Sequence, residues 1–249
     1  MKKSLGMFLV LLSIAALAWA DANAFEAGVQ AAGTKNYEAA LEKFEQALKA
    51  DPNNLQYGSE YRQAVIAAEQ YERCLEFFAK LVEENPKAPN AFLNYGFAHV
   101  DRIPAEGAIT QVILANTALE QFSTALELEE SWLALYTRGN SYLFWPAIFG
   151  RAQLGVDDLN KAMEYTKAGD LHSHYARTYV ALGDGYWRLE DVAKAREIWQ
   201  EGAKLFPKHQ DLQVRLSKQG EELDTFLDTY FSTENRVDTD LREIWEAEN

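Results

Sequence analysis

Residues 37–86 read YEAALEKFEQALKADPNNLQYGSEYRQAVIAAEQYERCLEFFAKLVEENP, and this stretch repeats one spacing of residue types. Four positions recur at an interval of 34 residues: Ala40 with Cys74, Phe44 with Phe78, Ala47 with Leu81, and Pro52 with Pro86. A period of this length is the signature of stacked helix-turn-helix units. Proline suits the end of the second helix, because it lacks the N–H that a further turn would need. The spacing therefore predicts an all-α chain.

A third copy of the pattern lies near the other end of the sequence. It consists of Tyr179-x2-Leu182-Gly183-x2-Tyr186, then Ala195, Trp199, Gly202 and Pro207. These residues resemble the tetratricopeptide repeat family, whose pattern runs aromatic-x2-Leu-Gly-x2-Tyr, then Ala-x3-Phe-x2-Ala, then Pro. The resemblance implies a right-handed α-solenoid of about five helix-turn-helix repeats with a C-terminal capping helix. In such repeats, small residues let two helices approach closely, and large ones fill the layer between them.

The resemblance divides most of the chain into five repeat units. They span about residues 21–54, 55–88, 89–131, 132–175 and 176–209. Two insertions interrupt the third and fourth units. The first contains a predicted loop at 101–107, with an extended helix from Ala108, and the second is the aromatic segment 144–150, where Pro146 predicts a turn.

The sequence after the last repeat predicts two further elements. Asp211 to Tyr230, within the segment 210–230, is expected to form one amphipathic helix that covers the last repeat, because an end repeat would otherwise expose its apolar face. The acidic tail, residues 231–249, contains Asp240-x-x-Glu243, the pattern of a capping box. We therefore expect a short tail helix that folds back onto the scaffold.

Residues 1–20 have the pattern of a secretory signal peptide. Lys2 and Lys3 precede an apolar run, and Ala18-Trp19-Ala20 fits a small-x-small cleavage site. The apolar run is too short to be a good membrane span, although an uncleaved anchor remains the alternative. No second long apolar stretch follows, so we expect no membrane insertion after cleavage. The pattern predicts secretion across the inner membrane into the periplasm of a Gram-negative bacterium.

The charge of the chain argues against two classes of partner. The formal net charge is −14, and the predicted signal peptide contains two lysines and no acidic residue. Binding to nucleic acid needs a basic surface stripe, and binding to an anionic membrane surface needs a basic cluster. We therefore expect neither. The single cysteine, Cys74, is expected to be buried and inert at a helix crossing.

The resemblance also implies where a partner would bind. In this family, positions 2, 5, 9, 12 and 13 of each repeat point into a concave groove. The residues expected to line the groove are Phe25, Val29, Leu93, Phe97, Tyr136, Asn140, Phe144, Val180, Asp184 and Trp187. Phe25 and Val29 replace the Lys and Asn with which some family members clamp a terminal carboxylate, so that mode of binding is not expected.

The predicted groove is apolar and aromatic, which suits a hydrophobic helix, a peptide or a small ligand. The alternative is that the C-terminal helix or the inserted loops fill it. The aromatic segment from Tyr142 to Gly150 likewise either packs against a neighbouring repeat or anchors a partner.

No catalytic constellation stands out in the sequence. His172-x-His174, with Asp170 and Glu164 nearby, supplies at most part of a metal site, because structural zinc needs four ligands and catalytic zinc three. There is no glycine-rich phosphate loop and no nucleophile elbow. We expect no enzyme activity, no metal and no cofactor.

The sequence thus favours a non-catalytic exported scaffold that binds a protein or peptide partner in its groove, in envelope assembly, secretion or transport. The alternative is an accessory or carrier protein that holds an apolar small molecule for a solute transporter. An enzyme centred on His172 and His174 is a third, weaker hypothesis. Self-association through the end repeats is left open.

Overall fold

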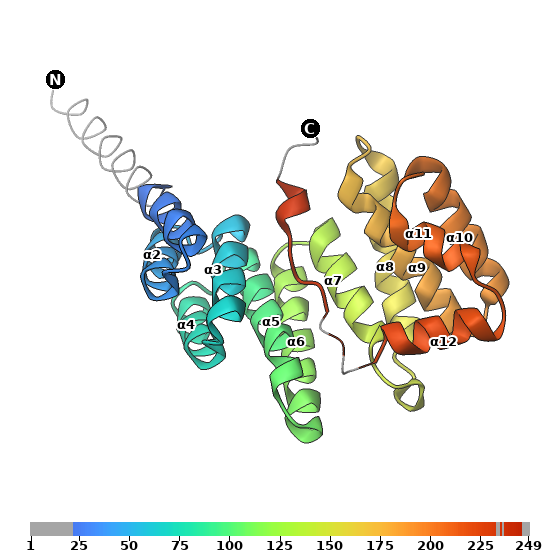
Figure 1. Ribbon diagram of the computed structural model, residues 1–249, viewed down its shortest axis with the longest axis horizontal. Helices are drawn as coiled ribbons and strands as arrows, with labels where there is room; N and C mark the ends of the chain where they lie inside the picture. The colour runs from blue at the N-terminus through green and yellow to red at the C-terminus, as the bar shows by residue number, and fades with distance from the viewer. Residues whose placement is uncertain (1–21, 233–234, 236, 246–249) are drawn as a thin grey trace, which may run out of the picture. The chain divides into compact units, whose positions relative to one another are not determined.

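The computed structural model describes residues 22–232, 235 and 237–245, and their regular structure is helical (Figure 1). The predicted signal peptide, residues 1–20, lies outside the described residues. The chain divides into two compact units. Unit 1 comprises Met1–Arg102 and Thr239–Arg242, and unit 2 comprises Ile103–Asp238 and Glu243–Asn249.

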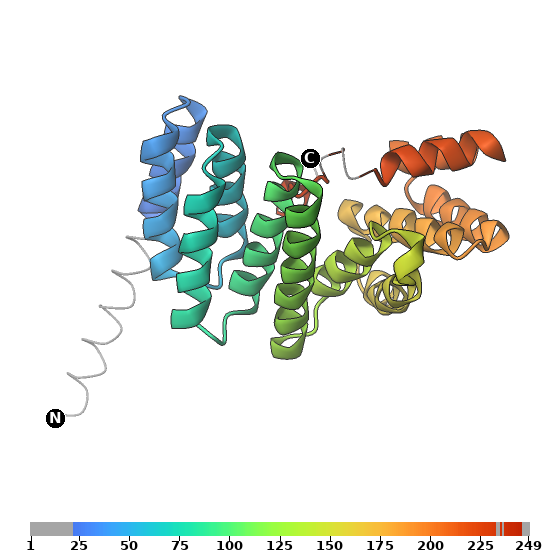
Figure 2. The ribbon, with the colours of Figure 1, turned by 90° about the horizontal axis from the view of Figure 1, so that it is seen from below.

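Unit 1 is a stack of helices that follow one another in chain order (Figure 2). Residues 22–33 are helical, and the helices after them are α2 (Tyr37–Ala50), α3 (Leu55–Ala68), α4 (Tyr71–Glu84) and α5 (Pro89–Arg102). Local signals set their ends. The Asn54 side chain caps α3 by accepting the N–H of Tyr57 at 3.1 Å, and Glu69 ends α3 with a left-handed φ of 55°.

The repeated large residues form the core of unit 1. Phe44 and Phe78 are completely buried, and Tyr61 packs edge-on against Phe78 with ring centroids 5.7 Å apart. Cys74 is buried as a free thiol in the same cluster, as the repeat pattern predicts. Burial raises the pKa of this thiol, which keeps it protonated and unreactive.

Unit 2 begins with a single 3₁₀ turn, Ile103–Ala105, and continues with helices of 8 to 21 residues. Its α-helices are α6 (Ala108–Leu128), α7 (Trp132–Leu143), α8 (Ala152–Ala168), α9 (Ala176–Arg188), α10 (Val192–Leu205), α11 (Gln210–Ser217) and α12 (Glu221–Tyr230). Two further 3₁₀ turns lie between these helices, at Ala147–Phe149 and Ser173–Tyr175. The pairs α7 with α8 and α9 with α10 pack closely, as do α8 and α9.

Glycine permits the closest of these contacts. A Cβ atom on Gly183 of α9 would lie 2.2 Å from Nε1 of Trp199 on α10, far inside contact distance. Trp199 is completely buried and donates from Nε1 to the carbonyl of Val180 at 3.3 Å. The small and large residues of the repeat pattern therefore face each other across this helix pair.

The inserted aromatic segment, residues 144–150, forms a turn. Pro146 precedes the 3₁₀ turn, and Gly150 follows it with a left-handed φ of 62°. Trp145 is buried beneath the guanidinium of Arg151, whose Cζ lies 3.6 Å from the ring centroid. Phe149 stays exposed at the tip of the turn.

The prediction of one capping helix from Asp211 to Tyr230 is wrong. The structure breaks it into α11 and α12 at Lys218–Gly220, where Gly220 adopts a φ of 50° and ψ of −133° that favours glycine. The break lets both short helices bury apolar residues in the core of unit 2: Leu212 from α11, and Leu223 and Leu227 from α12.

The tail contains less helix than its capping-box pattern predicts. Its regular structure within the described residues is one 3₁₀ turn, Arg242–Ile244. The Asp240 carboxylate accepts the N–H of Arg242, two residues on, at 2.9 Å, which makes a tight turn rather than a helix cap. No helix of the described residues combines the length and apolar character that a membrane span requires.

Candidate functional site

The four predicted groove residues of unit 1 do not form an exposed apolar surface. Leu93 and Phe97 of α5 are only 1% and 6% exposed. Phe25 is half-buried, and its ring stacks on Tyr57 with centroids 4.4 Å apart. Val29 is 44% exposed. The prediction of an open apolar groove is wrong for this unit, because α5 packs against both α3 and α4 and its apolar residues belong to the interior.

A buried polar cluster joins α3 to α5 instead. Arg62 of α3 is completely buried and donates from Nε to Asn94 Oδ1 at 3.1 Å and from Nη1 to Asp101 Oδ2 at 2.8 Å. The Phe97 ring centroid lies 4.7 Å from Cζ of Arg62, within reach of a cation–π interaction. A buried guanidinium is tolerated only when its charge is paired and its N–H groups are bonded, and this cluster provides both.

The tail segment Thr239–Arg242 completes the cluster. Nη2 of Arg62 donates to the backbone carbonyl of Thr239 at 3.1 Å, and the Thr239 hydroxyl donates to Asp101 Oδ1. Arg242 forms a bidentate pair with Glu60 of α3, with N···O distances of 2.8 and 2.7 Å. The side chains of Thr239 and Leu241 are buried. A short stretch of tail is therefore held by α3 and α5 through its backbone and its side chains.

This cluster was not predicted, although the sequence contains two signals of it. Arg62 occupies a position where the repeat pattern has glycine. A second signal is Gly58, one turn earlier, because a Cβ there would lie 2.2 Å from the Asn94 amide nitrogen. The absence of a side chain at Gly58 makes room for Asn94, and Asn94 in turn positions Arg62.

In unit 2 the C-terminal helices cover part of the predicted groove. Asp184 is buried and accepts two hydrogen bonds from Arg215 of α11, both 2.6 Å long. Burial raises the pKa of Asp184, while Arg215 acts in the opposite direction. Asp184 is thus a structural ion-pair residue and not an exposed groove residue.

Trp187 and Phe144 are covered in the same way. Trp187 donates from Nε1 to Asp224 of α12 at 2.9 Å. The rings of Phe144 and Phe231 meet edge to face with centroids 4.9 Å apart. Of the two alternatives for the groove, filling by the C-terminal segment is what the structure has at these positions.

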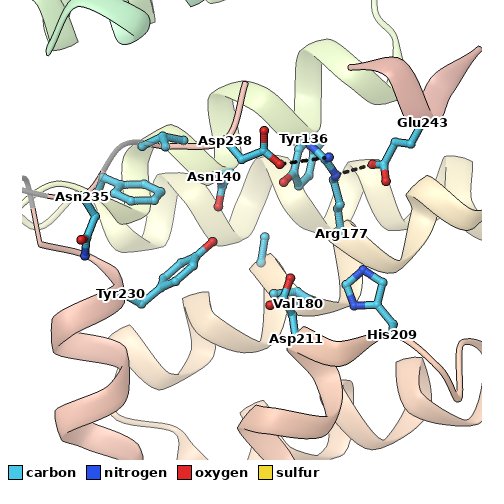
Figure 3. Close-up of a pocket in the computed structure, with 13 residues that line it drawn as sticks. Tyr136, Asn140, Arg177, Val180, His209, Asp211, Tyr230, Asn235, Asp238 and Glu243 are labelled. Carbon is cyan, nitrogen blue, oxygen red and sulfur yellow. Dashed lines mark ion pairs between the residues drawn. The ribbon is translucent and has the colours of Figure 1, made fainter. Parts of the chain in front are cut away.

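A pocket of about 410 Å³ remains in unit 2 (Figure 3). Four predicted groove residues line it: Tyr136, Asn140, Phe144 and Val180. Its other walls come from α9, from the start of α11, from the end of α12 and from the tail. The structure therefore brings these four residues together, whereas Asp184 and Trp187 do not line the pocket.

The pocket lining is about as polar as it is apolar and includes charged side chains, which corrects the prediction of an apolar groove with few polar groups. Arg177 of α9 forms ion pairs with Asp238, at 3.6 Å, and with Glu243 (Figure 3). Burial lowers the pKa of His209, whose Nδ1 has no hydrogen-bond partner in the described part of the chain. Burial also raises the pKa of Tyr230. Arg177 occupies position 2 of the fifth repeat, a groove position, so the repeat pattern does contain a signal for it.

The histidine pair is part of an aromatic cluster. His174 is buried, with its ring centroid 4.8 Å from that of Trp132, and His172 stacks on His174 at 5.3 Å. Asp170 and Glu164 are exposed. Across residues 22–232, 235 and 237–245, no group of three or more His, Cys, Asp or Glu side chains is placed to hold a metal ion.

Comparison with known proteins finds a family match over part of the chain. Residues 31–93 match the tetratricopeptide repeat family model. The chain is 32% identical over 78 residues to the photosystem I assembly protein Ycf3 of Synechococcus sp. (strain CC9311). That match covers 30% of this chain and 45% of Ycf3, so it spans less than half the length of the relative.

Solved structures share the fold over most of the chain. TTC0263, a thermophilic TPR protein of Thermus thermophilus, aligns with a TM-score of 0.57 at 22% identity, covering 80% of this chain and 97% of its own. YrrB, described as a TPR protein with an unusual peptide-binding site, aligns with a TM-score of 0.51 at 16% identity, covering 78% and 91%. The repeat pattern and the family match agree over residues 31–93, and the chain as a whole has the all-α solenoid fold of these TPR proteins.

Proposed function

We propose that this chain is a non-catalytic scaffold that binds a protein or peptide partner in the pocket of unit 2. The observation that carries the proposal is the convergence of Tyr136, Asn140, Phe144 and Val180 with Arg177 around one cavity. Apolar rings, an amide and a guanidinium together suit a polypeptide, which offers both side chains and backbone groups. YrrB is described as having a peptide-binding site and Ycf3 is named an assembly protein, which is in keeping with this role.

The polar lining favours a peptide over an apolar small molecule. Sites for apolar ligands are lined mainly by hydrophobic side chains with few polar groups. Here Arg177, His209 and Asp211 line the pocket, together with two carboxylates from the tail. Arg177 binds carboxylates in this structure, so an acidic side chain of a partner is a fitting ligand for it.

We also propose that the protein works outside the cytoplasm. The support is the signal-peptide pattern of residues 1–20. In the periplasm, a scaffold of this kind would serve envelope assembly, secretion or transport by holding a partner while other components act on it.

Site-specific photocrosslinking tests the binding site. A photoreactive benzoylphenylalanine at Asn140, inside the pocket, should capture one defined polypeptide in cells. The same group at Lys161, exposed on α8, is the matched control and should not. Arg177→Glu should lower the crosslinking yield by about tenfold, the range expected when a charge pair at an interface is reversed. Equal yields at Asn140 and Lys161 would refute a partner site in this pocket.

A further inference from the structure

The tail segment Thr239–Arg242 is bound to unit 1 in the way a peptide ligand is bound to a receptor. Residues 237–241 have no regular secondary structure. The segment contacts α3 and α5 through a backbone carbonyl, a hydroxyl and a guanidinium, and a separate peptide of similar sequence would present the same groups. We propose that the surface of α3 and α5 recognises an extended peptide of the sequence Thr/Ser-x-Leu-Arg, and that the chain's own Thr239–Arg242 occupies this site as an internal competitor.

The first element of recognition is independent of side chains. Arg62 Nη2 donates to the carbonyl oxygen of Thr239, a group that every residue carries. The guanidinium is already fixed from the other side by Asn94 and Asp101. An arginine that is held rigidly before a ligand arrives loses little freedom on binding it. The site is therefore preorganised for a backbone carbonyl.

The next elements select the sequence. Asp101 uses one carboxylate oxygen for Arg62 and the other for the Thr239 hydroxyl, so a hydroxyl residue is required at the first position. Leu241 is buried, which selects an apolar residue at the third position. Glu60 pairs with the Arg242 guanidinium through two hydrogen bonds, a geometry that lysine cannot reproduce.

The contacts described for the second position, Asp240, lie within the segment itself and do not involve α3 or α5. Asp240 accepts the backbone N–H of Arg242 at 2.9 Å and contacts its guanidinium at 3.3 Å. These contacts hold the segment's own turn, so another turn-forming residue can replace Asp240. The recognised sequence is accordingly Thr/Ser-x-Leu-Arg.

Occupation by the tail has a regulatory consequence. An external peptide can bind only when the tail has left the site. Its apparent affinity is therefore the intrinsic affinity multiplied by the fraction of molecules whose site is empty. A partner must therefore present a segment that competes with the tail. This inference rests on the proposed function in so far as the protein binds peptides, but it concerns unit 1 and is tested without the unit 2 pocket.

Full-length variants and a short labelled peptide test the proposal by fluorescence anisotropy. The peptide, Gly-Gly-Thr-Asp-Leu-Arg-Gly-Gly, omits the two acidic residues of the tail that pair with Arg177. The variant Arg242→Glu places like charges opposite each other at Glu60, which should release the tail and leave the site intact. It should bind the peptide at least about tenfold more tightly than the wild-type chain.

The matched control reverses the charge on the binding surface, at Glu60 of α3. The variant Glu60→Arg should lose binding of this peptide and gain binding of its counterpart with glutamate in place of arginine. Circular dichroism should show an unchanged helix content in each variant. If Arg242→Glu does not fold, Arg242→Ala removes the pair without adding repulsion and should bind the peptide more tightly than the wild-type chain.

Three results would overturn the inference. One is a folded Arg242→Glu chain that binds the peptide no better than the wild type. Another is binding of the arginine peptide by Glu60→Arg and Arg242→Glu alike. The last is a wild-type dimer that Arg242→Glu dissociates, because the tail would then serve a second copy of the chain. A failed crosslink at Asn140 would leave the peptide result unaffected, so the two proposals fail separately.

Discussion

Two buried polar side chains of unit 1, Arg62 and His99, differ in whether their nitrogen atoms form hydrogen bonds. Arg62 has a bonded partner for each guanidinium nitrogen. His99 of α5 is also buried, yet both of its ring nitrogens lack a hydrogen-bond partner among the described residues. Its ring lies against Tyr95, with centroids 4.7 Å apart. His99 is thus used as a flat packing group and must stay neutral.

The pKa of His99 predicts how acid affects stability. Burial, with a smaller contribution from Arg102, lowers the pKa of His99 to about 4. Between pH 6.5 and pH 4 the unfolded chain binds a proton at this residue and the folded chain does not, so stability falls as the pH falls. The loss should approach about 3 kcal/mol at pH 4, from the size of the pKa shift.

The variant His99→Phe removes this titration and should lose less stability than the wild type on acidification. Urea unfolding at pH 7.5 and pH 4.5 measures the difference. At pH 7.5 the variant should be at least as stable as the wild type, because it removes two unsatisfied nitrogens. A parallel loss of stability in both proteins would show that His99 does not titrate in this way.

At the scale of single residues, the sequence predicts the core better than the site. The repeat positions Phe44, Phe78 and Trp199 are all completely buried. Their environment follows from a spacing of large and small residues that the chain repeats. Arg62 could be recognised only as an exception to that spacing. Its partner Thr239 lies 177 residues further along the chain, and a long-range pairing of that kind has no local signature.

At the scale of elements, the short helix α11 is tied to α9 by a buried ion pair. It is only eight residues long, too short to be stable alone. It buries Leu212 and Arg215, and Arg215 forms its bidentate pair with Asp184 of α9. Since this pair is almost completely buried, removing one partner leaves the other as an uncompensated charge.

We therefore expect Arg215→Met to destabilise the protein by about 3 kcal/mol or more, as broken buried ion pairs do. The double variant Asp184→Leu/Arg215→Met should recover most of that loss, because no charge is left unpaired. Guanidinium unfolding gives both values, and Lys208→Met, at an exposed neighbouring position, is the control. A double variant no more stable than the single one would contradict the prediction.

The ends of the elements show where sequence patterns succeed and fail. The start of α6 at Ala108 agrees with the prediction, because Gly107 interrupts the apolar pattern there. The break between α11 and α12 was not predicted, although Gly220 is visible in the sequence. An amphipathic pattern continues across the break, and only packing against the core decides that the two halves separate. The covering of Trp187 and Phe144 by the C-terminal segment was one of the two alternatives that the sequence left open.

At the scale of the whole molecule, the first insertion coincides with the division of the chain. Unit 1 ends at Arg102 and unit 2 begins at Ile103, within the predicted loop 101–107. Each unit contains its own hydrophobic cluster. The interrupted repeat therefore coincides with a boundary between compact units, whereas the repeat pattern places residues 89–131 in a single repeat unit.

The proposed export concerns the whole chain and has its own test. If residues 1–20 act as a signal peptide, the protein recovered from the periplasmic fraction should begin at Asp21. Mass spectrometry of the intact protein measures its N terminus. Replacing the apolar residues Leu11 and Leu12 by Arg should leave the protein in the cytoplasm with its N terminus uncleaved. An uncleaved wild-type chain in the cytoplasmic fraction would contradict the proposal.

The buried thiol of Cys74 offers an unexpected practical use. It is the single cysteine of the sequence, and it lies in the core of unit 1. A thiol reagent can reach it only when α4 moves away from its neighbours, so the labelling rate reports how often that opening occurs. The native thiol is thus a probe of local opening in unit 1. Comparing the labelling rate of Cys74 in the wild-type chain and in Arg242→Glu would measure whether the bound tail slows the opening of the helices that it contacts.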